Sequence, residues 1–267
     1  MYTKTDLFAQ LRAMGAPRNV PVLMHSALRL IGEVAGGASG LLDALIEYFT
    51  AEGGLLAIPT HTWNNLGRTD VYTLDLTKNE SNLGAFARLA LEDGRGIRSE
   101  NATHSVVVFG ARENAEAMIA GEIDLLTPTG AESFYGRLYR AGGYVLLAGV
   151  SQNRNTYLHA VDEMLSISNR MGGEPYDVSV KRPSGEVLHR RLTLYHADFS
   201  PDVSLRFVNF DVAFRYLGCL KDGFLGDAPA QLCSAVGMYD AVKHIYEQSE
   251  SDPLATENSV LPKVYAK

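Results

Sequence analysis

The chain has 267 residues, of which 46% are hydrophobic and 21% are charged, and its formal net charge is −7. This length and balance are typical of a globular protein with a large core. Nucleic-acid binding is disfavoured, because phosphate backbones are held by clustered Lys and Arg. An acidic chain instead suits a neutral or cationic small molecule.

The two cysteines, Cys219 and Cys233, form neither a disulfide framework nor a metal-finger pattern. We expect both to be inert core thiols. The first residues lack a basic segment followed by an apolar stretch, which a signal peptide would need. No apolar run approaches the roughly 20 residues that span a bilayer. We therefore expect a cytoplasmic protein that contacts neither nucleic acid nor membrane.

Helix and strand patterns alternate in the first 60 residues. Apolar spacing predicts a helix over 5–14 with Thr5 as its N-cap, and a second helix that begins at Ser39 and runs to residue 49. Strands are predicted over 20–24 and 55–58, with a glycine-rich loop after the first. This order is typical of an α/β sheet, whose ligands bind at the carboxyl ends of the strands.

The middle of the chain begins with an aperiodic segment, 60–80, which we interpret as a long loop. Loops of this length are more often functional than idle. The pattern then predicts helices and a central buried strand. The elements expected after the loop are a helix over 83–91, a strand over 105–109, a helix over 111–119, a strand over 143–149 and a helix over 156–164.

After Arg170 the pattern changes to alternation. Residues 176–180 and 187–194 alternate around Pro183-Ser184-Gly185, which predicts a hairpin, and helices are expected over 207–217 and 235–248. No low-complexity linker or internal repeat divides the chain. We therefore predict a single domain over 1–267, with 170–267 as a C-terminal hairpin-and-helix elaboration. The expected fold class is a layered α/β/α arrangement around a mixed, largely parallel central sheet.

Three histidines have polar or acidic neighbours, and strand-like runs separate them along the chain. They are His104 in the segment 101–105, His159 in 156–163 and His196 in 194–199. Histidine is the side chain best suited to move protons near neutral pH. A lone histidine more often has a satisfied structural role. Three with hydroxyl or carboxylate neighbours indicate an enzyme cleft.

Other candidate sites give weaker signals. The glycine-rich loop 32–40 could bind a phosphate at a helix N-terminus, but it lacks dinucleotide and Walker spacing, so a plain tight turn stays open. His25 and Ser26 end a strand, where ligand contacts are common, although a cap is equally plausible. His61, flanked by Thr60 and Trp63, lies in the long loop and could line a pocket, but an exposed loop residue is the favoured interpretation. No G-x-S-x-G elbow supports a serine hydrolase, and without H-E-x-x-H or a cysteine cluster we expect no metal.

Taken in order, these segments resemble the aminoglycoside 3-N-acetyltransferase family. The resemblance covers roughly residues 5 to 245. The matching motifs are His25-Ser26-Ala27-Leu28, Gly32, Gly36-Gly37, Pro59-Thr60, the run 98–105, the run 128–133, Gly142-Gly143 through Gly149, the run 155–163 and His196-Ala197-Asp198-Phe199. The chain departs from the family pattern at Ala27, Ala102 and Asp162, where the family has Ser, Pro and Glu.

The resemblance implies direct transfer of an acetyl group from acetyl-CoA to the 3-amino group of an aminoglycoside, and hence antibiotic resistance. It assigns His196 as the general base, with Asp198, Asp211 or Asp222 as the carboxylate that orients it. The implied catalytic residues are His196, His159 and Glu163. The implied substrate-binding residues are His104, Asp162, Glu163 and Asp198. A histidine base and carboxylates suit an acceptor that binds as a cation.

The resemblance also implies where coenzyme A binds. Its phosphates would meet the turn formed by Ser26, Ala27, Leu28 and Arg29, and the helix start at Gly36 and Gly37. Pantetheine would lie along the extended backbone from Thr103 to Val107, beside Arg98. The implied cofactor residues in that stretch are Thr103, Ser105, Val106 and Val107. Groups near Ser105 are the candidate oxyanion donors, and neither cysteine nor a metal is needed.

Three other functions stay open from the sequence. One is acetyl-CoA-dependent acetylation of another small amine, for example in secondary metabolism. The others are a metal-assisted hydrolase and a non-catalytic module that binds coenzyme A or a nucleotide. The loop 62–80 and the hairpin after Arg170 are expected to set acceptor specificity. A homodimer would be ordinary for such an enzyme.

Overall fold

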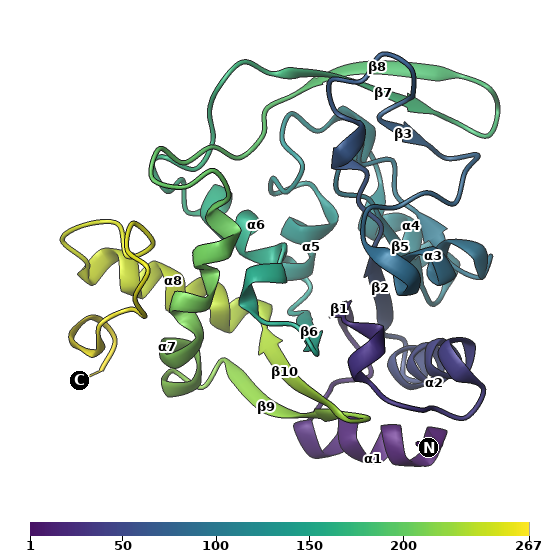
Figure 1. The fold of residues 1–267 in the computed structure, drawn as a ribbon, viewed down its shortest axis with the longest axis horizontal. Coiled ribbons are helices and arrows are strands. Elements are labelled where there is room, and N and C mark those ends of the chain that lie inside the picture. The colour runs from purple at the N-terminus through teal and green to yellow at the C-terminus, as the bar shows by residue number, and fades with distance from the viewer. Residues whose placement is uncertain (267) are drawn as a thin grey trace.

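The computed structural model describes residues 1–266 and is built on a seven-stranded sheet with the strand order β4-β5-β2-β1-β6-β10-β9. Figure 1 shows helices on both sides of this sheet. The strands are β1 Pro21–Ser26, β2 Leu55–Pro59, β4 Ile97–Arg98, β5 Val106–Phe109, β6 Tyr144–Ala148, β9 Leu220–Leu225 and β10 Ala228–Ser234. A second sheet contains β3 Leu74–Asp75, β7 Tyr176–Lys181 and β8 Val187–Leu192.

Parallel pairing is confined to the centre of the large sheet. Strand β1 is parallel to both β2 and β6. The pairs β2–β5, β4–β5, β6–β10 and β9–β10 are antiparallel. The predicted α/β class with a mixed sheet is therefore confirmed, but the expectation of a largely parallel sheet is wrong. The reason is that three of the seven strands, β4, β9 and β10, come from segments that the sequence pattern did not predict as strands.

The helices lie in two layers. The helices are α1 Lys4–Met14, α2 Gly37–Thr50, α3 Gly84–Glu92, α4 Arg112–Ile119, α5 Phe134–Arg140, α6 Tyr157–Met164, α7 Asp211–Tyr216 and α8 Ala235–Gln248. Buried side chains of α1, α2 and α3 share one core with one face of the sheet. Buried side chains of α4 to α8 share a second core with the other face. The predicted α/β/α layering is thus confirmed.

Two predicted helix caps are corrected by the structure. Helix α1 is capped by Thr3 and not by Thr5, because the Thr3 hydroxyl accepts the Asp6 N–H while Asp6 accepts the Thr3 N–H. Helix α2 begins after Gly36, whose φ of 79° suits glycine, so Ser39 lies inside the helix. The segment 207–217, predicted as one helix, divides into a 3₁₀ helix, Val203–Phe210, and α7.

The C-terminal third enters both sheets. The predicted hairpin is confirmed as β7 and β8, which pair antiparallel and form the small sheet with β3. The hairpin β9–β10 instead extends the main sheet, and α8 packs in one of its two cores. Within 170–267, the hairpin β7–β8 lies outside the main sheet, whereas β9 and β10 belong to it. Within residues 1–266, no helix has the length and apolar character that crossing a membrane requires.

Candidate active site

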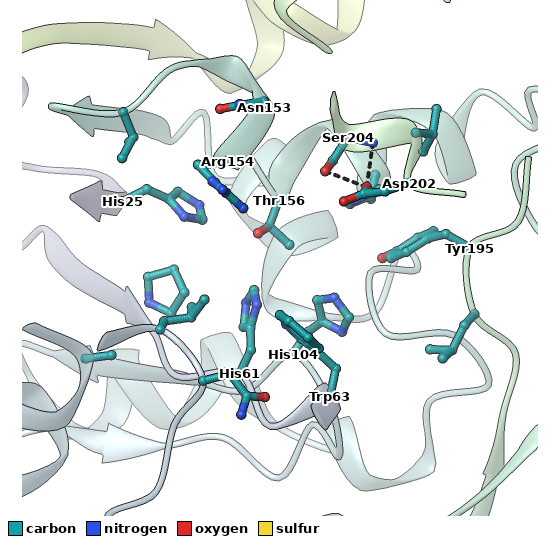
Figure 2. Close-up of a pocket in the computed structure, with 18 of the residues that line it drawn as sticks. His25, His61, Trp63, His104, Asn153, Arg154, Thr156, Tyr195, Asp202 and Ser204 are labelled. Atoms are coloured by element: carbon teal, nitrogen blue, oxygen red, sulfur yellow. Dashed lines mark hydrogen bonds between the residues drawn. The ribbon is translucent and has the colours of Figure 1, made fainter. Parts of the chain in front are cut away.

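A cavity of about 690 Å³ opens where the parallel strands end. Strand β1 contributes His25 and Ser26 at its carboxyl end, and β2 contributes Ile58 and Pro59. Residues 150–156, which follow β6, and the segment 194–204, which contacts them, form another wall. Figure 2 shows these side chains arranged around the opening. This is the edge at which ligands of α/β sheets collect.

Five histidines line the cavity. They are His25, His61, His104, His159 and His196. Burial lowers the pKa of His25 and of His104 to about 3, and it holds the pKa of His61 and of His159 well below the ordinary value. These four imidazoles are therefore neutral at physiological pH. A neutral imidazole can accept a proton or a hydrogen bond, which a charged one cannot.

His61 is buried in the cavity wall, so the expectation of an exposed loop residue is wrong. Its Nε2 lies 3.0 Å from the Tyr135 hydroxyl, and that hydroxyl donates to the carbonyl oxygen of His104 at 3.0 Å. Because a hydroxyl has a single proton, His61 must donate to Tyr135, which leaves Nδ1 of His61 as the basic nitrogen. The rings of His61 and His104 are 4.6 Å apart, and Thr103 holds Nδ1 of His104 at 2.8 Å.

His159 is buried on α6, between two aromatic rings. The Tyr195 ring stacks on its imidazole at 3.7 Å between centroids and 12° between planes. The Phe207 ring meets it at 4.9 Å and 66°, edge to face. Its Nδ1 is buried and has no hydrogen-bond partner. Packing, and not a hydrogen bond to Nδ1, therefore sets the orientation of this ring.

His196 lies at the rim, where its side chain is 60% exposed. Its Nε2 is 2.9 Å from a carboxylate oxygen of Asp198. Of the three carboxylates considered for orienting His196, Asp198 is thus the one in contact. Asp222 instead holds Arg215 at 2.6 Å, and Asp211 lies near Gln231 and Arg215.

Asp162 and Glu163 lie behind the cavity wall and are not among the residues that line it. Asp162 is buried, with its Oδ2 3.2 Å from the Arg170 guanidinium, and burial raises its pKa to about 7. Glu163 accepts a hydrogen bond from the Thr127 hydroxyl at 2.6 Å and another from the Thr129 hydroxyl at 2.5 Å. Both carboxylates already have internal partners, so the predicted direct contact with a substrate lacks support in this geometry.

The residues predicted to meet the phosphates of coenzyme A follow β1. Ser26 lines the cavity, whereas Ala27, Leu28 and Arg29 form the turn next to it, with Arg29 exposed. Gly36 and Gly37 are exposed at the start of α2. Arg98 has a different role, because its guanidinium donates to the carbonyl oxygens of residues 60, 78 and 80 and so fixes both ends of the long loop.

The predicted pantetheine path along β5 requires correction. The backbone of Val107 pairs with both β2 and β4, and Val106 pairs with β2 while its N–H and C=O both bond to Ser99. Val106 and Val107 therefore have no free backbone edge for the amides of a ligand, and any such contact would be confined to residues 103–105. The Ser105 hydroxyl donates to the carbonyl oxygen of Thr60 at 2.9 Å, so it is not a free oxyanion donor.

Comparison with known proteins gives the chain its family. The sequence model described as Aminoglycoside 3-N-acetyltransferase matches residues 23–247, which is most of the chain. The chain belongs to the aminoglycoside 3-N-acetyltransferase family. The resemblance found in the motifs is thereby confirmed.

Individual members of this family are distant relatives. The SPbeta prophage-derived aminoglycoside N(3')-acetyltransferase-like protein YokD of Bacillus subtilis is 28% identical over 201 residues, covering 67% of this chain and 72% of that protein. The structure of AAC-IIIb in a binary complex with CoASH superposes with a TM-score of 0.79 at 21% identity, covering 94% and 99% of the two chains. A histidine-to-alanine mutant of AAC(3)-IVa in complex with gentamicin gives 0.75 at 22% identity, covering 96% and 95%.

Several lining residues of this acetyltransferase family member were not predicted. The most polar or aromatic are Trp63, Asn82, Asn153, Arg154, Thr156, Tyr195, Asp202 and Ser204. Tyr195 could have been found as the immediate neighbour of His196, and Arg154 as the neighbour of the 155–163 motif. Asp202 and Ser204 give only a local turn signal, since the Ser204 hydroxyl and N–H both donate to Asp202.

The described residues contain no cluster of metal ligands. Within residues 1–266, no three or more His, Cys, Asp and Glu side chains are grouped so that they could hold a metal ion. The two cysteines are both buried and free, and burial raises the pKa of Cys219 to about 12. A thiol held in its protonated form is a poor nucleophile.

Proposed function

We propose that the protein transfers an acetyl group from acetyl-CoA to the 3-amino group of an aminoglycoside in a direct, ternary-complex reaction, and so confers antibiotic resistance. The observation that carries this proposal is a cavity lined by neutral histidines at the carboxyl ends of the central strands, in a member of this family. The complexes of relatives with CoASH and with gentamicin support both substrates. The protein would act in the cytoplasm, where acetyl-CoA is available.

The reaction needs a base, because an amine that binds as an ammonium ion must lose a proton before it attacks the thioester. Sequence comparison assigned this role to His196, and its contact with Asp198 supports a histidine–carboxylate pair. His159 is the stronger candidate, because it is held in one orientation inside the cavity wall and stays neutral. We therefore assign the base to His159 and propose that His196 and Asp198 bind the acceptor at the rim.

Coenzyme A would reach the cavity past Ser26. Its phosphates would be held by the turn after β1 and by the positive end of the α2 dipole at Gly36 and Gly37, although the Gly37 N–H already donates to the carbonyl oxygen of Val34. Arg154 also faces the cavity (Figure 2) and could neutralise one phosphate charge. The acceptor would occupy the side with Trp63 and Asp202.

One observation favours the second candidate function, acetylation of another small amine. Among the residues that line the cavity, Asp202 is the one carboxylate, and Arg154 is in the same wall. A polycationic aminoglycoside is better matched by several carboxylates than by one. An acceptor with one or two amines would suit this wall equally well.

The first experiment measures free thiol released from acetyl-CoA in the presence of aminoglycosides or simple mono- and diamines. Thiol release that depends on an aminoglycoside, with product analysis placing the acetyl group on the 3-amino nitrogen, would support the proposal. Release with simple amines alone would favour the second function. Binding of acetyl-CoA without release for any amine would contradict acyl transfer. Chelators should not change the rate.

The second experiment compares His159→Gln with His196→Gln under saturating substrates. Loss of a general base should lower kcat by about 10²–10⁴-fold. We expect that loss for His159→Gln, and for His196→Gln mainly a higher KM for the amine. The opposite pattern would return the base to His196. Near-normal turnover in both variants would exclude a histidine base in this cavity.

A further inference from the structure

The ring of His159 lacks the hydrogen bond that usually orients a catalytic imidazole. Its Nδ1 is buried without a partner, although the neighbouring carboxylates of Asp162 and Glu163 lie on the same helix. A ring without such a bond can turn about χ2 unless packing prevents it. The stacked ring of Tyr195 and the edge of Phe207 are the groups that confine it.

Tyr195 is itself held by a chain of hydroxyl groups. Its hydroxyl contacts the Thr129 hydroxyl, and Thr129 donates to Glu163 at 2.5 Å. Thr129 has one hydroxyl proton, and Glu163 receives it, so the Tyr195 hydroxyl must be the donor to Thr129. Thr129 is fully buried, and Thr127 donates to the other carboxylate oxygen of Glu163. The anchor of Tyr195 is therefore a half-buried carboxylate whose two oxygens both accept hydrogen bonds from threonine hydroxyls.

The two ends of this chain belong to one helix. His159 and Glu163 are four residues apart on α6 and thus share a helix face. The helix presents the imidazole and, one turn later, the carboxylate that anchors the ring stacked on that imidazole. The contacts thus form a closed path, which runs from His159 to Tyr195, Thr129 and Glu163 and returns to His159 along the helix. A rigid closed arrangement can hold a reacting group to within a fraction of an ångström.

We propose that Tyr195 is a positioning residue for acyl transfer, which fixes the ring plane of His159 by stacking, and that Glu163 fixes Tyr195 through Thr129. This inference rests on the proposed function, with His159 as the base. It gives Glu163 a task that needs no contact with either substrate. It also separates the roles of two adjacent residues, since Tyr195 acts through His159 while His196 faces the rim.

The kinetic test uses Tyr195→Leu, which removes the ring, and Tyr195→Phe, which keeps it. We expect Tyr195→Leu to lower kcat by roughly 10-fold or more with KM for acetyl-CoA within about twofold, because misplacing a reacting group mainly affects turnover. Tyr195→Phe should keep roughly a third of turnover or more, since stacking survives. The matched control is Tyr157→Phe, which removes a buried hydroxyl of α6 that donates to the carbonyl oxygen of Ala235, and it should leave kcat unchanged.

Two results would overturn the proposal. One is turnover of Tyr195→Leu within about twofold of the unmodified protein. The other is an equal loss in Tyr195→Leu and Tyr157→Phe, which would indicate general destabilisation. The anchor is tested with Glu163→Gln and Glu163→Ala. Glutamine can still accept the Thr129 proton, so it should retain more turnover than alanine, and equal rates would remove Glu163 from the chain.

A readout independent of activity is the proton NMR signal of the His159 ring, identified by its absence in His159→Gln. A ring stacked on tyrosine should be shifted upfield, and the shift should disappear in Tyr195→Leu and persist in Tyr195→Phe. If the protein acetylated no amine, the proposed function would fail while this signal still tested the stacking. An unshifted signal in an active enzyme would overturn the positioning role alone.

Discussion

His25 and His104 illustrate what the cavity demands of single residues. His25 is buried and His104 is partly buried, and desolvation lowers the pKa of each to about 3. In the unfolded chain a histidine binds its proton near pH 6.5. Below that pH the unfolded state is protonated while the folded state is not, so acid favours unfolding. The stability is fully present above pH 6.5 and is lost as the pH falls.

This linkage predicts a steep acid dependence of stability. Each such histidine should lower the free energy of unfolding by about 1.4 kcal/mol for every pH unit below 6.5. Replacing one, in His25→Asn, should make the slope between pH 6 and pH 4 shallower by about that amount. Urea unfolding at a series of pH values measures the slope of the unfolding free energy against pH. The exposed His189 provides the control, since His189→Gln should leave the slope unchanged, and equal slopes for all three proteins would contradict the prediction.

At the scale of single residues, the sequence predicted which side chains belong to the site better than it predicted which side chains touch one another. The types and order of His104, His159 and His196 were enough to predict a cavity with histidines. Neither the burial of His61 nor the stacking of Tyr195 on His159 could be predicted, because both depend on segments that meet only in the folded chain. Asp162 and Glu163 have the composition of substrate ligands, but their partners, Arg170 and two threonines, are distant in sequence.

Helix starts show how local signals compete. At α1 two threonines precede the apolar face, and the one three residues before an aspartate forms the reciprocal capping box. At α2 a glycine with positive φ starts the helix, so the serine two residues inside cannot cap it. The sequence contained both correct signals, Thr3 with Asp6 and the Gly36-Gly37 pair.

These two helices offer a paired stability test. Thr3→Ala removes a side chain that caps α1 and should lower the free energy of unfolding by about 0.5–2 kcal/mol. Ser39→Ala places a good helix former on an exposed position inside α2 and should change stability by less than about 0.5 kcal/mol. Denaturant unfolding of both variants measures the difference. A larger loss for Ser39→Ala would mean that the cap lies where the sequence pattern placed it.

The hairpin β9–β10 was the main element that the sequence analysis missed. Its turn is Gly226-Asp227, flanked by the paired residues Leu225 and Ala228. A glycine followed by aspartate between strand-like runs is a known two-residue hairpin signal, and Gly226 has φ of 60°. Pro229 next to the turn weakens the strand pattern, since proline lacks the N–H that a sheet uses. The central strands and most helices could be predicted from the sequence, because each contains its own apolar pattern.

On the scale of the whole molecule, Arg170 joins parts of the chain that are far apart. Its guanidinium contacts Asp162 on α6 at 3.2 Å and Asp252 beyond α8 at 2.8 Å, and its side chain is 1% exposed. Its carbonyl oxygen accepts the backbone N–H of His196. The residue therefore ties α6 and the C-terminal segment to the rim of the cavity.

Removing this cation should be costly. Arg170→Met leaves Asp162 buried without its partner and should lower the free energy of unfolding by about 3–5 kcal/mol. Replacing both residues, in Arg170→Met with Asp162→Leu, should recover much of that loss, because the fully buried carboxylate is then removed with its cation, and the remaining partner, Asp252, is partly exposed. The exposed pair Lys4 and Glu47 is the control, since Lys4→Met should cost about 1 kcal/mol or less. If Arg170→Met lowered the free energy of unfolding by less than about 1 kcal/mol, as for an exposed pair, water would have to reach Asp162.

The order of strands in the main sheet also bears on self-association. One margin of the sheet is β4, which is two residues long, and the other is β9, which bears the exposed residues Lys221 and Asp222. Short or charged margins resist the addition of a strand from another molecule. Two copies of this chain would therefore not join their sheets into one continuous sheet. A homodimer would have to form through helices, loops or the small sheet, and the main sheet should resist the edge-to-edge stacking that leads to fibrils.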